Sequence, residues 1–267
     1  MQKSVINRQR VDLFSMLMII CLFTGLVTGF SNLGSQNFIS IKVGGALLIG
    51  ALGMIGLIWR SLTISQPILQ LRLFTNHLFT GHVIGFFLTQ IISLGFAFLL
   101  PNYIQLVNGN TPMVAGMVVL PAGFAGAVFA PLGGRILDRF DARRPIIFGI
   151  TLCLISLVIF TLMARHLSNI VIACVYILYM AGMGSVMTNA LTIIGKENVP
   201  QGNAILNTLQ QFAGAIGTSI VAMIVASSQA NLHVNCNIAT VIGTQHAFIL
   251  LTVFAIIVWI SYYRSVK

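Results

Sequence analysis

The sequence predicts an all-α, polytopic membrane protein with eight transmembrane helices. Hydrophobic residues make up 57% of the 267 residues and charged residues only 7%, whereas an ordinary soluble domain carries about 25% charged residues. The apolar residues are gathered in charge-free runs, and a helix needs about 20 such residues to cross a bilayer. The basic residues gather between alternate runs. These three observations favour the lipid bilayer as the surroundings of the chain.

The charge-free runs define the spans in chain order. The run 73–134 is long enough for two spans and contains two turn signals, Pro101-Asn102 and Gly109-Asn110-Thr111-Pro112. The other predicted spans are 13–30, 43–59, 146–163, 169–189, about 204–227, and 246–262. The longest segments outside the membrane are then 230–245 and 60–76. The second of these is either a short helix lying along the membrane surface or a plain linker.

The distribution of positive charge predicts the orientation of the spans. Cytoplasmic loops carry an excess of Lys and Arg. With the N-terminus inside, only Lys42 and Arg165 of the 14 basic residues fall outside. All four acidic residues, Asp12, Asp138, Asp141 and Glu197, also fall inside. We therefore expect a multi-pass protein of the plasma membrane with both termini in the cytoplasm.

The sequence argues against several other classes of protein. The net charge of +10 is dispersed between apolar runs, whereas nucleic-acid binding needs basic residues gathered on one soluble face. No Gly-Lys-Ser/Thr phosphate loop is present, which disfavours ATP-driven transport. No nucleophile–base pair or metal cluster occurs in the predicted spans, so we expect neither an enzyme nor a cofactor or metal site.

One predicted inner loop, between the fourth and fifth spans, has a distinctive spacing. It contains Gly134, then Asp138 and Arg139, then Arg143. A glycine lets two helices approach closely, and a carboxylate among arginines can form charge-assisted hydrogen bonds. Such a group can latch adjacent helices on one side of the membrane. An ordinary positive-inside loop with an incidental aspartate is the alternative.

This spacing resembles the G-x-L-a-D-r-x-G-r-k signature of the major facilitator superfamily. Three other stretches resemble its 14-helix drug:proton antiporter branch, and the resemblance covers nearly the whole chain. These stretches are Leu100 to Gln105 with Gly109 and Gly116 to Pro121, Gly202 to Gly217, and Gln66 to Phe74. One departure is Asp141, which stands where the signature has its second glycine.

The resemblance implies a specific architecture. The eight spans would correspond to family helices seven to fourteen, with residues 1–76 forming two extra helices and a linker. Residues 77–267 would form the C-terminal six-helix half. The first six helices of the family have no counterpart in this sequence, and no predicted span contains Asp or Glu. Because intramembrane acids are the usual proton relays, the residues that couple transport to protons are expected elsewhere.

Polar residues within the spans are candidates for a substrate cavity, because such groups are costly in lipid unless they face protein, water or substrate. The candidates are Gln90, Asn207, Gln210 and Gln211. Cross-helix hydrogen bonding is the alternative role for each of them. Small residues predict close helix packing at two places, at Gly182, Gly184 and Ser185 and at Ala213, Gly214, Gly217 and Thr218.

The family resemblance implies part of a secondary active transporter, with proton-coupled efflux of lipophilic or cationic drugs. Such transporters hold substrate between two halves of the protein, so we expect an N-terminal half or a homodimer partner besides the lipid and the drug-like substrate. A truncated, non-transporting fragment, or a split-gene subunit that needs a separate N-terminal half, is the alternative.

Overall fold

A computed structural model describes residues 12–32, 40–64, 77–139, 143–197, 199–231 and 235–265. The described chain contains no strand and forms α1 (Leu13–Asn32), α2 (Ala46–Thr63), α3 (His77–Leu106), α4 (Pro112–Arg139), α5 (Arg143–Met163), α6 (Asn169–Glu197), α7 (Val199–Asn231) and α8 (Cys236–Ser265). Within these described ranges, eight helical spans are long and apolar enough to cross a membrane. The prediction of an all-α protein with eight spans is therefore confirmed.

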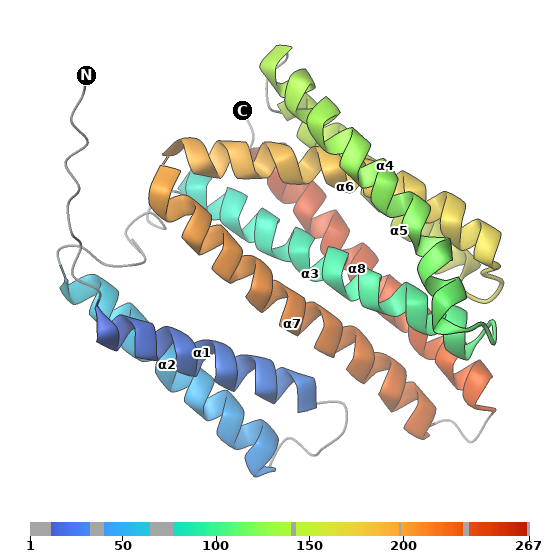
Figure 1. The fold of residues 1–267 in the computed structure, drawn as a ribbon, viewed down its shortest axis with the longest axis horizontal. Coiled ribbons are helices and arrows are strands. Elements are labelled where there is room, and N and C mark those ends of the chain that lie inside the picture. The colour runs from blue at the N-terminus through green and yellow to red at the C-terminus, as the bar shows by residue number, and fades with distance from the viewer. Residues whose placement is uncertain are drawn as a thin grey trace.

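Six of the helices form a bundle in which α3 is central (Figure 1). Helix α3 contacts α4, α6, α7 and α8, whereas α4 and α5 both pack against α6. Helix α8 lies against α3, α5 and α7. This arrangement leaves α4 and α7 at opposite sides of α3 and α6, and the candidate site lies where these four helices come together.

Aromatic side chains fill the centre of the bundle around Phe96 of α3. The Phe96 side chain is fully buried. Its ring centroid lies 4.9 Å from that of Phe160 on α5, 4.7 Å from that of Tyr179 on α6, and 5.6 Å from that of Phe248 on α8. Aromatic pairs at these distances are favourable beyond the area they bury. One residue on the central helix thus joins three neighbouring helices.

Glycine allows two pairs of helices to pack backbone to backbone. A Cβ atom at Gly217 on α7 would overlap the carbonyl oxygen of Ile91 on α3. A Cβ atom at Gly182 on α6 would lie 2.5 Å from the carbonyl oxygen of Gly149 on α5. Small residues at helix interfaces permit such close approach in membranes. The close packing that the sequence predicted at Gly182 and Gly217 is confirmed.

Helices α1 and α2 form a separate hairpin beside α7 (Figure 1). Helix α2 begins after a π-helical turn, Ile41–Gly45, at whose start the Val43 N–H donates to the Ser40 hydroxyl at 3.3 Å. Within the described chain, α2 contacts α1 and this turn, and α1 also contacts α7. The rings of Phe23 and Phe212 meet edge to face at 6.4 Å across the α1–α7 contact. The division into residues 1–76 and 77–267 remains a prediction.

The predicted turn at Pro101-Asn102 is wrong. Both residues lie inside α3, which continues to Leu106. The Asn102 amide donates to the Phe98 carbonyl of the preceding turn at 2.8 Å, and proline is tolerated in transmembrane helices. The chain instead turns at Gly109, whose φ of 66° is a conformation that glycine adopts readily.

The predicted outer loop at 230–245 is also wrong. Helix α7 extends to Asn231 and α8 begins at Cys236, so most of this polar segment is helical. A polar contact joins the two helices there. The Gln229 amide of α7 donates to the Thr240 hydroxyl of α8 at 2.7 Å, and that hydroxyl donates to the Cys236 carbonyl at 2.7 Å. The surface helix or linker predicted at 60–76 lies largely outside the described residues, which end at residue 64 before α3.

Candidate functional site

A cavity of about 350 Å³ lies where α3, α4, α6 and α7 come together. Ligand sites in proteins are commonly clefts of about 300–1,000 Å³ with mostly apolar linings and a few polar groups. The lining residues are Gln90, Ser93, Leu94, Gly123, Gly126, Ala127, Met180, Met183, Gly184, Met187 and Gln210. The cavity is thus built mainly from methionine, small residues and two amide side chains.

Helix α6 supplies three methionines to the cavity. Met180, Met183 and Met187 are spaced by three and four residues, which places them on one face of a helix. Methionine is flexible and polarisable, and it adapts to apolar partners of different shapes. This face therefore provides an apolar surface that can fit more than one ligand.

Helix α4 approaches α6 closely beside these methionines. A Cβ atom at Gly184 on α6 would lie 2.7 Å from the carbonyl oxygen of Gly126 on α4. Glycine lets the two helices meet at this point, and both residues line the cavity. About one turn before Gly126 on α4, a Cβ atom at Gly123 would meet open space. The cavity therefore opens beside a tight helix contact.

Gln90 connects two walls of the cavity. Its side chain is 5% exposed, and its amide nitrogen donates to the sulfur of Met187 at 3.2 Å. A thioether is a weak hydrogen-bond acceptor. The geometry thus places a buried amide donor against a weak partner in a largely apolar cavity, where a ligand with a better acceptor can compete for it.

The structure brings together two of the four amide residues that the sequence singled out. Gln90 and Gln210 line the cavity, whereas Asn207 and Gln211 are exposed and do not line it. The sequence reasoning missed the three methionines of α6. Their spacing was visible, but methionines at helical spacing are also common on lipid-facing and core surfaces.

The predicted latch residues lie at the junction of α4 and α5. Gly134, Asp138 and Arg139 belong to the last turns of α4, and Arg143 is the first residue of α5. Their side chains, and residues 140–142 between the helices, lie outside the described residues. Pairing between Asp138 and the arginines therefore remains a prediction.

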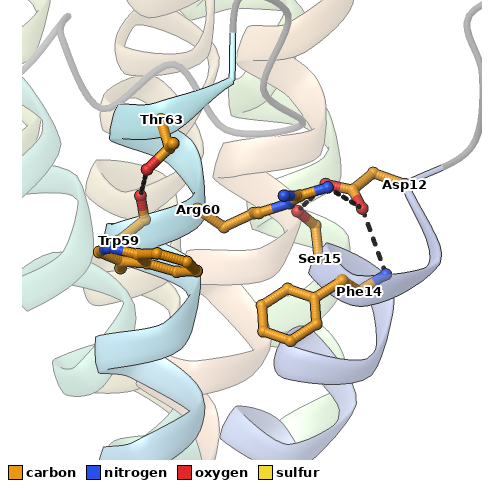
Figure 2. Close-up of polar contacts among 6 residues, drawn as sticks. All are labelled: Asp12, Phe14, Ser15, Trp59, Arg60 and Thr63. Carbon is orange, nitrogen blue, oxygen red and sulfur yellow. Dashed lines mark hydrogen bonds and ion pairs between the residues drawn. The ribbon is translucent and has the colours of Figure 1, made fainter.

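An ion pair joins the ends of α1 and α2 (Figure 2). The Arg60 Nε donates to the Asp12 Oδ2 at 3.0 Å, and the Ser15 hydroxyl donates to the same oxygen at 2.7 Å. The Phe14 N–H donates to the other oxygen of Asp12 at 3.2 Å. The hydrogen bond from Arg60, followed by that from Ser15, lowers the pKa of the Asp12 carboxyl to about 2. Asp12 is therefore ionised at neutral pH and both caps α1 and holds α2.

None of the residues that line the cavity is charged. None of the eight spans contains Asp or Glu, and the described residues contain no group of His, Cys, Asp and Glu that could hold a metal ion. The side chains of this cavity therefore offer a ligand apolar contacts and uncharged hydrogen-bonding groups.

Comparison with known proteins identifies the family. The model of the Major Facilitator Superfamily matches residues 58–218, a range that contains every residue of the cavity lining. The chain belongs to the major facilitator superfamily. Membership is consistent with the eight apolar helices and with a place in the lipid bilayer.

Several of the related bacterial proteins are named for drug resistance. The chain is 31% identical to the lincomycin resistance protein LmrB of Listeria innocua over 230 residues, covering 85% of this chain and 49% of that protein. It is 32% identical to LmrB of Bacillus subtilis over 266 residues, covering 94% and 56%. It is 23% identical to the multidrug resistance protein Stp of Mycobacterium tuberculosis over 223 residues, covering 82% and 41%. The chain spans about half the length of these relatives.

Proposed function

We propose that this chain is part of a secondary active transporter that exports lipophilic or cationic drugs across the plasma membrane. The observation that carries the proposal is the cavity between α3, α4, α6 and α7, lined by three methionines and two amide side chains. Such a lining suits apolar ligands of varied shape that carry a hydrogen-bonding group. The names of the relatives, which refer to lincomycin and multidrug resistance, support the same class of substrate.

In this proposal the cavity is one wall of the substrate path. Gln210 and Ala127 line the cavity and are both exposed, so the recess is open on one side. Facilitators bind substrate between two halves and rock one half against the other. A second half, either an N-terminal half or a homodimer partner, would supply the opposite wall. A truncated fragment without transport activity, or a split-gene subunit, is the competing interpretation.

We further propose that proton coupling, if it drives this transporter, uses groups outside the eight spans of this chain. Intramembrane acidic residues are the usual proton relays, and none of the eight spans contains Asp or Glu. The charge distribution of the sequence supports cytoplasmic termini. The loop with Gly134, Asp138, Arg139 and Arg143 would then latch α4 to α5 on the cytoplasmic side.

A drug-accumulation assay tests the proposed function. A drug-sensitive bacterium would express this chain alone, or together with the part of the Bacillus subtilis relative that this chain does not cover. Accumulation of labelled lincomycin and of a lipophilic cationic dye would then be measured with and without an uncoupler. We expect energised efflux from the reunited halves, or from the chain alone if it dimerises. Equal accumulation in all these cells and in cells without the chain would contradict the proposal and favour the fragment interpretation.

A further inference from the structure

A second recess, which we call the α4–α5 groove, lies at the arginine-rich end of the bundle. It has a volume of about 360 Å³ and is lined by Phe129, Leu132, Gly133, Arg144, Pro145, Phe148 and Ser185. It shares no lining residue with the cavity described above. We propose that the α4–α5 groove binds one anionic phospholipid, with an acyl chain along its apolar walls and the headgroup phosphate beside Arg144.

The packing of the helices explains why a groove exists there. Helices α4 and α5 both pack closely against α6 but contact each other little. At the base of the groove, a Cβ atom at Gly133 on α4 would lie 2.9 Å from the Cα of Ser185 on α6. Helix α6 therefore forms the floor, and α4 and α5 form two separated walls.

The walls of the groove are apolar and accessible from outside the bundle. Phe148 on α5 is 62% exposed, and Leu132 and Phe129 on α4 are 40% and 39% exposed. All three belong to spans that are apolar enough to lie in the membrane. Since the surroundings of these side chains are lipid, an acyl chain is the occupant whose chemistry matches them.

The charge at the mouth of the groove selects the headgroup. Arg144 is exposed and begins the α5 span, at the edge of the apolar region. Its guanidinium has five N–H donors, so it can bind a phosphate while keeping a protein partner. In the sequence, Arg135, Arg139 and Arg143 precede Arg144 by nine residues or fewer. Basic pockets between transmembrane helices on the cytoplasmic side are known to bind anionic lipid headgroups.

Lipid competition measured by native mass spectrometry tests the proposal on the full chain. The purified protein would be offered phosphatidylglycerol and phosphatidylcholine with identical acyl chains in equal amounts. We expect a preference of about fivefold or more for phosphatidylglycerol, since one basic residue near the membrane contributes roughly that factor. Arg144→Gln should reduce the preference to near one, and Arg144→Lys should retain most of it.

The matched control is Arg165→Gln, which removes one charge two residues beyond the opposite end of α5. Arg165 is also exposed, and its Nε donates to the Gln245 side chain at 3.2 Å. This variant should keep the preference for phosphatidylglycerol. Equal binding of the two lipids by the unsubstituted protein, or an equal loss in the Arg165→Gln and Arg144→Gln proteins, would overturn the proposal.

A fluorescence measurement locates the lipid independently. Both native tryptophans, Trp59 and Trp259, would be replaced by phenylalanine, and a tryptophan would be introduced by Phe148→Trp or, as a control on the same helix, by Leu162→Trp. Leu162 is 77% exposed and lies near the other end of α5. Brominated phosphatidylglycerol should quench the first reporter more strongly than brominated phosphatidylcholine does, and should show no such preference at the second. Equal quenching of the Phe148→Trp protein by both lipids would refute a selective site in the groove.

Discussion

The amide nitrogen of Gln90 on α3 donates to the sulfur of Met187 on α6 at 3.2 Å, across 97 residues of sequence. Both residues line the proposed substrate cavity. A buried amide with a weak acceptor is ready to exchange that partner for an oxygen acceptor on a ligand. This contact therefore connects the packing of the bundle with the chemistry of substrate binding.

Replacing Gln90 should weaken transport more than it weakens the fold. In Gln90→Leu the side chain keeps its approximate size but loses its hydrogen-bonding groups. We expect drug efflux by the complete transporter to fall about three- to tenfold, which corresponds to one hydrogen bond to substrate. Efflux rates and membrane expression would both be measured. Met187→Leu is the control, because it removes the weak acceptor and keeps the Gln90 donor. A smaller effect for Gln90→Leu than for Met187→Leu would contradict the role given to Gln90.

The packing of α5 on α6 should depend on Gly182. A valine at this position would place its Cβ 2.5 Å from the Gly149 carbonyl oxygen and 2.9 Å from the Leu152 Cβ. Overpacking of this kind destabilises proteins by about 1–3 kcal/mol. Thermal unfolding in detergent should show a clear decrease in Tm for Gly182→Val. The control is Gly116→Val, where nothing lies within 4 Å of the added Cβ, and its Tm should stay near that of the unsubstituted protein. Equal decreases would argue against this helix contact.

The ion pair between Asp12 and Arg60 should stabilise the α1–α2 hairpin at neutral pH. The folded-state pKa of Asp12 is lowered from 3.8 to about 2, so the stabilisation is complete above the unfolded-state pKa and is lost as the pH falls through about 2. We expect Asp12→Asn to lower the Tm slightly, since both side chains are partly exposed. The difference in Tm should be constant from pH 5 to 8 and shrink as the pH approaches 2. A difference that changes between pH 5 and 8 would show that another group is responsible.

The latch proposal predicts a loss of transport without a loss of membrane insertion. Asp138→Asn removes the negative charge that would hold the arginines of the α4–α5 junction. Because hydrogen bonds between charged groups contribute about 1.5–3 kcal/mol, efflux by the complete transporter should fall about tenfold or more. Asp141→Gly is the control, since it restores the glycine of the family signature and should retain efflux. Unchanged efflux in the Asp138→Asn protein would refute the latch.

The sequence was sufficient to predict the fold class and the number of spans. Charge-free runs of about 20 residues have few alternatives to a membrane-spanning helix. The turn signals were less informative, because Pro101 lies inside α3 and the polar segment after Ala230 continues the helices α7 and α8. In both places side-chain amides and hydroxyls bond to nearby groups, and composition alone does not show where such bonds form.

The candidate site was only partly predictable. A polar residue inside a span is conspicuous in the sequence, and Gln90 and Gln210 were identified in this way. Which face of a helix meets which neighbour depends on tertiary packing, so Gln211 could not be distinguished from Gln210. Methionines resemble any other apolar residue in a membrane protein, so the contribution of Met180, Met183 and Met187 became visible only in the folded bundle.

The central claim is that the methionine-lined cavity is a wall of the substrate path, and two adjacent residues test it directly. Both side chains are exposed on α7, but Gln210 lines the cavity and Gln211 does not. Efflux of labelled lincomycin by the complete transporter would be compared for Gln210→Trp and Gln211→Trp at equal expression. If the cavity is part of the path, Gln210→Trp blocks efflux and Gln211→Trp retains it. Equal efflux by the two variants, or a greater loss with Gln211→Trp, would contradict the account.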